Sequence, residues 1–317
     1  GQDFSCQIAM SNYKVFLGIA LLVLSTWALS TQEASGKWLM QISLPLFCLV
    51  FFRYAVDVVL VLAITLPTKG IAIFHSKSYK MQIIRGLTTL FTTMAIFTAL
   101  SYLPQAEATA IYFLAPLLVL CAAPWFLAEP SRLHRWIAAV VGFLGVLVIV
   151  RPGAGLDPVG VAYALLAAFM IAVQFIYTKK LAADDSQTTL LWTGVVGLCG
   201  GLVLVPFQWH ESILALSEFG VWQWLIIINV GLFGSLGHLL QIKAYQHAPA
   251  SLLAPFSYFQ IIAAAALGFL IWGQFPDFWA WVGILIVCGS GIAVTVVEWR
   301  HNQKVLKIVE KIIDEKN

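Results

Sequence analysis

Residues 133–150, LHRWIAAVVGFLGVLVIV, decide what kind of protein this chain is. After Arg135 the stretch contains no charged residue until Arg151, and nearly every position is Val, Leu, Ile, Ala or Gly. As a helix these residues would extend about 27 Å, close to the roughly 30 Å hydrocarbon thickness of a bilayer. The stretch therefore predicts a helix that spans a membrane.

Nine further segments share this length and character, so the sequence predicts ten transmembrane helices. Of the 317 residues, 61% are hydrophobic and only 10% are charged, whereas about 25% are charged in an average soluble domain. So few charges cannot cover a soluble surface, which excludes a soluble enzyme, a nucleic-acid binder and a disordered chain. The ten expected spans cover about residues 13–33, 42–66, 80–103, 105–127, 133–150, 159–180, 187–207, 219–242, 250–272 and 277–297.

The distribution of Lys and Arg predicts the orientation of these spans. With a cytoplasmic N-terminus, 13 Lys and Arg residues fall in cytoplasmic segments and only Lys37 and Arg151 fall outside. Both termini are then cytoplasmic, which agrees with an even number of spans. We expect a multi-pass protein of the cytoplasmic (bacterial inner) membrane. A cleavable signal peptide in place of the first span is the alternative.

The chain also contains a weak internal repeat. A shift of 145 residues lays 99–147 over 244–292 and places Pro104 on Pro249 and Trp136 on Trp281. The first span similarly matches the sixth. The sequence therefore predicts two five-helix repeats, 13–150 and 159–297, and because five is odd the second repeat is inverted in the membrane. Inverted repeats place a solute site near the midplane between two related gates, and a duplication without such a role is the alternative.

Several motifs carry a resemblance to a known family. They are YLPQAEATAI at 102–111, Ala115-Pro116, LAE at 127–129, GHLL at 237–240, AYQHAPA at 244–250, APFSY at 254–258 and Pro276-Asp277. With these motifs the chain resembles the ten-helix EamA branch of the drug/metabolite transporter superfamily. The resemblance implies a carrier of small organic metabolites such as amino acids, S-adenosylmethionine or riboflavin. Two positions depart from the family pattern, with Gln274 and Glu33 standing where other residues are usual.

Charged residues within the spans are the first candidates for a functional site, because an isolated charge in hydrocarbon costs about 2.5–3.5 kcal/mol. Arg53 lies near the middle of the second span, and Asp57 follows it by four residues, one helical turn away. The pair is interpreted either as a structural ion pair or as an anchor in which Arg53 binds a solute carboxylate or phosphate.

Glu33 and Lys37 have the same four-residue spacing at the expected outer end of the first span. We expect a salt bridge at the outer rim, with the lining of the outer cavity mouth as the alternative. Glu107 lies one turn into the fourth span and is interpreted either as a proton-binding carboxylate or as a helix-capping residue.

Polar and aromatic residues deeper in the spans complete the predicted solute- or proton-binding site. His238 and Gln241 share a helix face, although a lone His in a helix is often only a packing residue. The remaining candidates are Tyr112, Tyr258 and Gln260.

Near the cytoplasmic face, Glu129 is a candidate inner-gate residue, or it neutralises the basic loop around Arg132 and Arg135. Residues 298–317 are expected to form an amphipathic tail helix that lies on the cytoplasmic membrane surface or pairs with a second copy.

The sequence predicts no catalytic residues, no metal site and no cofactor. Gly231-x-x-Gly234-x-x-Gly237-His238 lies inside an apolar helix, which favours close helix packing over phosphate binding.

These observations together predict a secondary-active transporter of a small organic solute that works by alternating access. Transport is expected to be coupled to protons or to a counter-solute, in a monomer or homodimer surrounded by membrane lipids. A passive facilitator or pore is the first alternative. An intramembrane enzyme is the second, and the chain lacks the HExxH and Gly-x-Ser-x-Gly patterns that would favour it.

Overall fold

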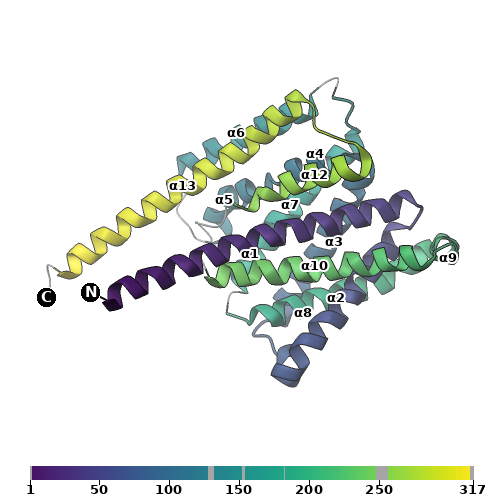
Figure 1. Cartoon of the computed structure of the whole chain (residues 1–317), viewed down its shortest axis with the longest axis horizontal. Coiled ribbons are helices and arrows are strands. Elements are labelled where there is room, and N and C mark those ends of the chain that lie inside the picture. Colours follow the sequence, from purple (N-terminus) through teal and green to yellow (C-terminus); the bar gives the residue numbers. More distant parts are fainter. Residues whose placement is uncertain (1, 128–131, 152–153, 182, 248–255, 315–317) are drawn as a thin grey trace.

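The computed structural model describes residues 2–127, 132–151, 154–181, 183–247 and 256–314, and within them it contains helices and no strands. The described chain departs from a simple bundle of long helices in two ways. One span is divided into two shorter helices, and two short 3-10 helices follow longer ones (Figure 1). The elements are α1 (Gln2–Gln41), α2 (Leu46–Lys69), η1 (Gly70–Phe74), α3 (Tyr79–Tyr102), α4 (Gln105–Tyr112), α5 (Ala115–Phe126), α6 (Leu133–Val150), α7 (Pro158–Lys180), α8 (Ser186–Leu204), η2 (Val205–Gln208), α9 (Trp209–Ser217), α10 (Val221–His247), α12 (Phe259–Trp272) and α13 (Phe278–Asp314).

Over the described ranges, nine helical segments are long and apolar enough to cross a membrane, and α12 is a shorter apolar helix. The expected ninth span, 250–272, begins among residues 248–255, which the structure does not describe. The all-helical membrane class predicted from the sequence is therefore confirmed, with about the expected number of spans.

The fourth span is broken in its middle. Helix α4 ends at Tyr112 and α5 begins at Ala115, with Phe113 and Leu114 forming a turn between them. Pro116 explains the break, because it has no backbone N–H to donate and its ring crowds the carbonyl four residues earlier. Two half-helices thus replace the single helix expected over 105–127.

The first span is longer than expected at its outer end. Hydropathy placed the end of this span near residue 33, but α1 continues to Gln41. The polar residues after Leu29 gave the appearance of a loop, yet Ser30, Gln32 and Glu33 are at most 6% exposed because they face other helices. Polar residues on the inward face of a helix end the apolar run without ending the helix.

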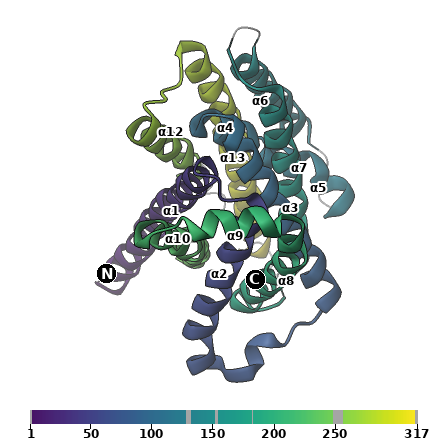
Figure 2. The ribbon, with the colours of Figure 1, turned by 90° about the vertical axis from the view of Figure 1, so that its right-hand side faces the viewer.

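Helices far apart in the sequence lie side by side in the bundle. Helix α1 packs along α10, α3 along α7, α2 along α8 and α6 along α13 (Figures 1 and 2). Glycines permit this close approach: a Cβ at Gly201 would lie 2.9 Å from the Phe51 Cα, and one at Gly231 would lie 2.3 Å from the Val56 Cβ. The packing role predicted for the glycines of α10 is confirmed.

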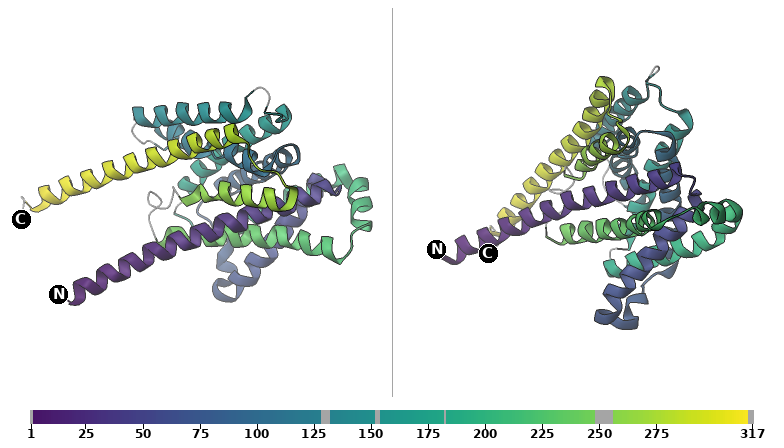
Figure 3. Two further views of the ribbon diagram at one scale, coloured as in Figure 1. Left: turned by 45° about the horizontal axis from the view of Figure 1, so that its top comes forward. Right: turned by 45° about the vertical axis from the view of Figure 1, so that its right-hand side comes forward.

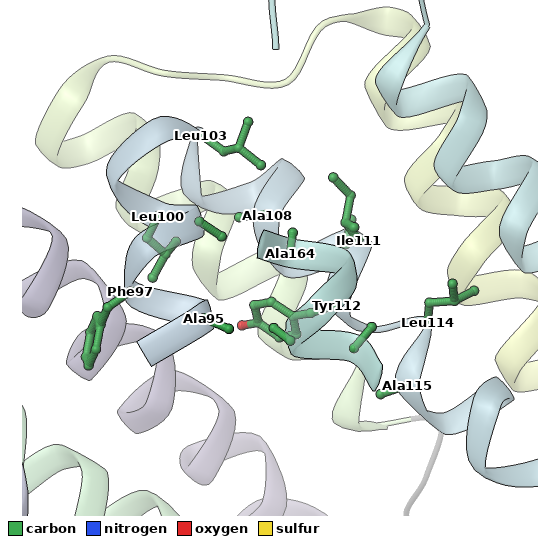
Figure 4. Packing of buried hydrophobic residues seen from close by; sticks show 14 of the residues in the cluster. Ala95, Phe97, Leu100, Leu103, Ala108, Ile111, Tyr112, Leu114, Ala115 and Ala164 are labelled. Carbon is green, nitrogen blue, oxygen red and sulfur yellow. The ribbon is translucent and has the colours of Figure 1, made fainter. Parts of the chain in front are cut away.

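The largest apolar cluster extends through most of the bundle, and one part of it lies where α3, α4, α7 and the start of α5 meet. Figure 4 shows Phe97, Leu100, Ile111 and Tyr112 of this cluster, each at most 3% exposed. Ala164 of α7 is fully buried among them. Small residues on α7 bring its backbone close to α3 and α4, which fixes the position of Tyr112.

The two ends of the described chain extend from the same end of the bundle (Figures 1 and 3). The helix expected after residue 297 is present as a straight continuation of α13 to Asp314. Its position on a membrane surface, and the repeat boundaries at 150 and 159, stay predictions.

Replacing Gly201 with Ala should destabilise the protein, because the new methyl would meet backbone rather than a movable side chain. We expect a loss of about 1–3 kcal/mol, as for other overpacked sites, measured as a lower thermal unfolding temperature in detergent. Gly289→Ala is the matched control, since a Cβ there has no atom within 4 Å. Equal unfolding temperatures for the two variants would contradict this packing role.

Candidate functional site

Three residues predicted from the sequence meet in one buried network, which we call the Glu33 junction: Glu33 of α1, Tyr112 of α4 and Gln260 of α12. The Glu33 Oε1 accepts hydrogen bonds from the Tyr112 hydroxyl at 2.7 Å and from the Gln260 Nε2 at 3.1 Å. The Gln260 Nε2 also donates to the Tyr112 oxygen at 3.3 Å. The junction joins helices separated by more than 140 residues, since Tyr112 and Gln260 lie 148 residues apart.

Neighbouring backbone groups hold this junction in place. The Gln105 Nε2 donates to the Ser30 carbonyl at 2.9 Å, and the Ser30 hydroxyl donates to the Gln260 carbonyl at 3.2 Å. Neither Gln105 nor Ser30 was predicted from the sequence. The signal for Gln105 was its place in the polar run that follows Pro104 at the start of α4.

Lys37 lies one turn beyond Glu33 but has different partners. Its Nζ donates to the Leu103 carbonyl at 2.7 Å and to the Gln274 Oε1 at 3.4 Å, and lies 4.9 Å from the centre of the Trp272 ring. Leu103 caps the C-terminus of α3, where the helix dipole favours a cation. Glu107 interacts with Lys37 electrostatically.

The expected rim salt bridge between Glu33 and Lys37 is therefore wrong. The two side chains are 6% and 2% exposed, and α1 carries both of them into the interior of the bundle. The extension of α1 to Gln41 is the physical reason, because it places these residues before the end of the helix rather than at it.

Arg53 and Asp57 are both buried on α2 and interact electrostatically, although no salt bridge joins them in the described part of the chain. The Asp57 Oδ1 accepts a hydrogen bond from the Ser235 hydroxyl at 2.5 Å. The Arg53 guanidinium lies 4.5 Å from the centre of the Tyr54 ring, and its buried Nε has no hydrogen-bond partner among the described residues. Arg53 thus keeps one buried donor without a partner among the described residues.

His238 lies on α10 opposite this guanidinium. It forms a side-chain hydrogen bond with Gln241, as their shared face predicts, and interacts electrostatically with Arg53 and Arg85. The Arg85 Nε donates to the Thr178 hydroxyl at 2.7 Å, and Arg85 Nη1 donates to Thr193. Arg85 was given no role from the sequence, but it points between α7 and α8 and adds a second buried cation near His238.

Tyr258, the residue just before α12, is buried against two other elements. Its ring centre lies 5.4 Å from that of Phe113, at the break between α4 and α5. Its hydroxyl lies against α13, where a Cβ at Gly291 would be 1.6 Å away from it. Glu129, the candidate inner-gate residue, lies outside the described residues.

Ion pairs close the bundle near each end. Lys69 at the end of α2 pairs with Asp185 before α8, and Arg151 after α6 pairs with Asp277 before α13. Hydrogen bonding and the charge of Lys69 lower the pKa of Asp185, and the Ala280 backbone N–H and Arg151 lower that of Asp277. Both carboxylates are therefore ionised at neutral pH, and their contribution to stability is lost only as the pH falls through these lowered pKa values.

A polar cavity of about 350 Å³ lies beside the first of these pairs. It opens between the end of α2, the start of α8 and the last turns of α10. Its lining residues are Lys69, Asp184, Asp185, Ser186, Gln187, Leu239, Ile242 and Lys243. Across the described part of the chain, no group of three or more His, Cys, Asp and Glu side chains could hold a metal ion.

Comparison with known proteins adds a family. The model of the EamA-like transporter family matches residues 16–151 and again 158–296. An S-adenosylmethionine uptake transporter of Rickettsia bellii is 27% identical over 270 residues, 85% of this chain and 89% of that protein. A riboflavin transporter of Vibrio cholerae is 28% identical, covering 90% and 93%. The pseudopaline exporter CntI of Pseudomonas aeruginosa is 25% identical, covering 88% and 95%.

The fold itself also has a counterpart of known structure. A crystal structure superposes with a TM-score of 0.60 over 91% of this chain and 98% of that chain, at 19% sequence identity. At this identity the likeness concerns the fold alone.

Tyr112→Phe should destabilise the Glu33 junction, because the Glu33 carboxylate would lose one of its hydrogen-bond donors. We expect a loss of about 1–3 kcal/mol in a thermal or denaturant unfolding experiment. Tyr102→Phe is the control, since Tyr102 is 50% exposed. In a Glu33→Gln background the cost of Tyr112→Phe should shrink, and an unchanged cost would show that the two side chains are not coupled.

Proposed function

Because the chain belongs to the EamA-like transporter family, we propose that it is a secondary-active transporter of a small organic solute with an anionic group, working by alternating access. The observation that carries the proposal is the buried Arg53, whose Nε has no partner among the described residues. A guanidinium is the side chain best suited to bind a carboxylate or phosphate with two parallel hydrogen bonds.

The surroundings of Arg53 support its role as the solute anchor. An unpaired charge between membrane helices is costly, so its retention needs a reason. Asp57 is engaged by Ser235, which leaves the Arg53 charge incompletely compensated within its own helix. His238 and Arg85 face the same region. Three nitrogen-bearing side chains from α2, α3 and α10 thus favour an anion there.

The packing of the helices supports alternating access by two inverted repeats. Under the 145-residue shift, Gly142 corresponds to Val287 and Gly145 to Ser290. A Cβ at Gly142 would lie 3.1 Å from the Ser290 Oγ, and one at Gly145 would lie 3.0 Å from the Val287 Cγ2. The same shift exchanges these two contacts, as a pseudo-twofold axis between α6 and α13 would.

The broken helices support the same axis. Phe113 and Tyr258 correspond under the 145-residue shift, lie at the breaks of their spans and contact each other. Discontinuous helices near the midplane are where inverted-repeat transporters bind their solutes. The Glu33 junction directly adjoins these two breaks, which places it beside the proposed route of the solute.

The excess of Lys and Arg supports a cytoplasmic location for both termini in a bacterial inner membrane. Lys69–Asp185 then lies at the cytoplasmic end, because α2 runs toward it, and Arg151–Asp277 lies at the outer end. We propose that these ion pairs act as gates that open in turn. The polar cavity beside Lys69–Asp185 would form the cytoplasmic entrance.

The relatives support a small-molecule cargo but favour neither import nor export. Their names include both an uptake transporter and an exporter. Glu107 remains our candidate for proton coupling, because its Oε2 is buried without a partner among the described residues. Transport by the wild type that does not depend on pH would contradict that role.

Arg53→Gln should abolish recognition of the anionic group. We expect the affinity for the best-stabilising solute in a thermal-shift screen to fall by about 2–5 kcal/mol, the cost of removing one partner of a buried charge pair. Arg300→Gln, at an exposed position, is the control. If the solute shifts the unfolding temperature of Arg53→Gln as much as that of the wild type, Arg53 does not bind the anionic group.

Solute counterflow in proteoliposomes tests the transport mechanism. A carrier should accelerate uptake of labelled solute when unlabelled solute is present inside, whereas a passive pore should not. Absence of this trans-stimulation would exclude alternating access in favour of a facilitator.

The gates can be tested without knowing the solute. In a variant without native cysteines, Gln241→Cys is a reporter for a membrane-impermeant thiol reagent. Asp185→Asn should speed its modification from the cytoplasmic side, and exchanging the charges of Lys69 and Asp185 should restore the slow rate. Arg151→Gln, the matched control, should speed modification only from the opposite side. Equal effects from both sides would contradict separate gates.

A further inference from the structure

The Glu33 junction contains hydrogen-bond acceptors that nothing in the described structure fills. The Glu33 Oε2 and the Gln105 Oε1 are both buried without a partner among the described residues. Glu33 is 6% exposed and Gln105 is fully buried. Because an unsatisfied buried polar group costs about 1–3 kcal/mol, the junction favours a ligand that donates hydrogen bonds.

The junction also contains a buried carboxyl group that no cation among the described residues contacts directly. The side chains that hydrogen-bond to Glu33, which are Tyr112, Gln260 and Gln105, are neutral. Lys37 lies on the same helix, but its ammonium group is engaged by Leu103 and Gln274 and interacts with Glu107. Burial disfavours an ionised carboxylate unless a cation lies beside it. A bound cation would therefore stabilise the ionised form of Glu33.

A row of three aromatic rings begins at Tyr112, which contacts Glu33. The Tyr112 and Phe113 ring centres are 5.7 Å apart, and those of Phe113 and Tyr258 are 5.4 Å apart. The faces of aromatic rings attract organic cations. A carboxylate, an amide oxygen and these rings together form a set of groups suited to an ammonium group rather than to a metal ion.

We propose that the Glu33 junction is a cation subsite that binds the protonated amine of the transported solute. This inference rests on the proposed function, in which Arg53 binds the anionic group. Arg53 interacts electrostatically with Glu33, which supports their engaging one molecule. The solute class is then zwitterionic: a small molecule with a protonated amine and a carboxylate or phosphate.

Matched ligands distinguish the two subsites. The full-length protein in lipid nanodiscs is titrated, by thermal shift, with the common L-α-amino acids, their N-acetyl forms and their amides. The N-acetyl forms keep only the anion, and the amides keep only the cation. We expect a free amino acid to stabilise the wild type, and its N-acetyl and amide forms to bind about tenfold or more weakly.

Glu33→Gln should weaken binding of the free amino acid by about tenfold or more and leave the affinity for its N-acetyl form unchanged. Glu211→Gln, at an exposed position of α9, is the matched control and should preserve the preference for the free amino acid. The cation subsite is excluded if N-acetyl forms bind the wild type as tightly as free amino acids, if Glu33→Gln changes neither, or if no free amino acid stabilises the wild type.

The two proposals fail in different ways. If N-acetyl forms bind the wild type and lose affinity only with Arg53→Gln, the anion anchor stands and the cation subsite is overturned. If a free amino acid binds through Glu33 but shows no counterflow, the subsite stands and the transport mechanism is overturned.

Discussion

The structure depends on how charged side chains are held between helices where water is scarce. In such an environment each charge needs a fixed partner or a ligand, because hydrocarbon offers neither. Lys37 is held by the carbonyl end of α3 and by a side-chain amide, and Asp57 by a serine hydroxyl. Glu33 and Arg53 differ from these, since each keeps a polar atom without a partner. The contrast separates charges whose polar atoms are satisfied within the fold from charges that keep an unsatisfied polar atom.

The helices could largely be predicted from the sequence, because a membrane span is a local property of about 20 consecutive residues. The errors have physical causes. The end of α1 was misplaced because its inward-facing polar residues resemble a loop in hydropathy. The break at Phe113 requires knowing that the freed backbone groups tolerate a turn there, although Pro116 was visible in the sequence.

The candidate site could be predicted only as a set of residues, not as contacts. Tyr112 and Gln260 were selected for being polar within an apolar span, and Glu33 was selected for its spacing from Lys37 at the outer rim. Their mutual hydrogen bonds follow from the packing of α1, α4 and α12. Asp57 shows the same limit: it interacts electrostatically with Arg53, as the spacing allows, but its hydrogen bond comes from Ser235, 178 positions later in the chain. Helical spacing indicates which side chains of one helix can meet. Tertiary packing decides which residues of other helices also bind them.

The contact between Phe113 and Tyr258 has a consequence for the balance between conformations. If the two repeats exchange shapes during a transport cycle, residues on their shared axis keep the same neighbour in both states. The pair is chemically unequal, since one ring carries a hydroxyl lodged against Gly291 and the other does not. Two states related by such an exchange would differ in free energy if they are built around an unequal pair, so the empty protein would favour one of them. A difference of 1.4 kcal/mol would already bias the populations about tenfold.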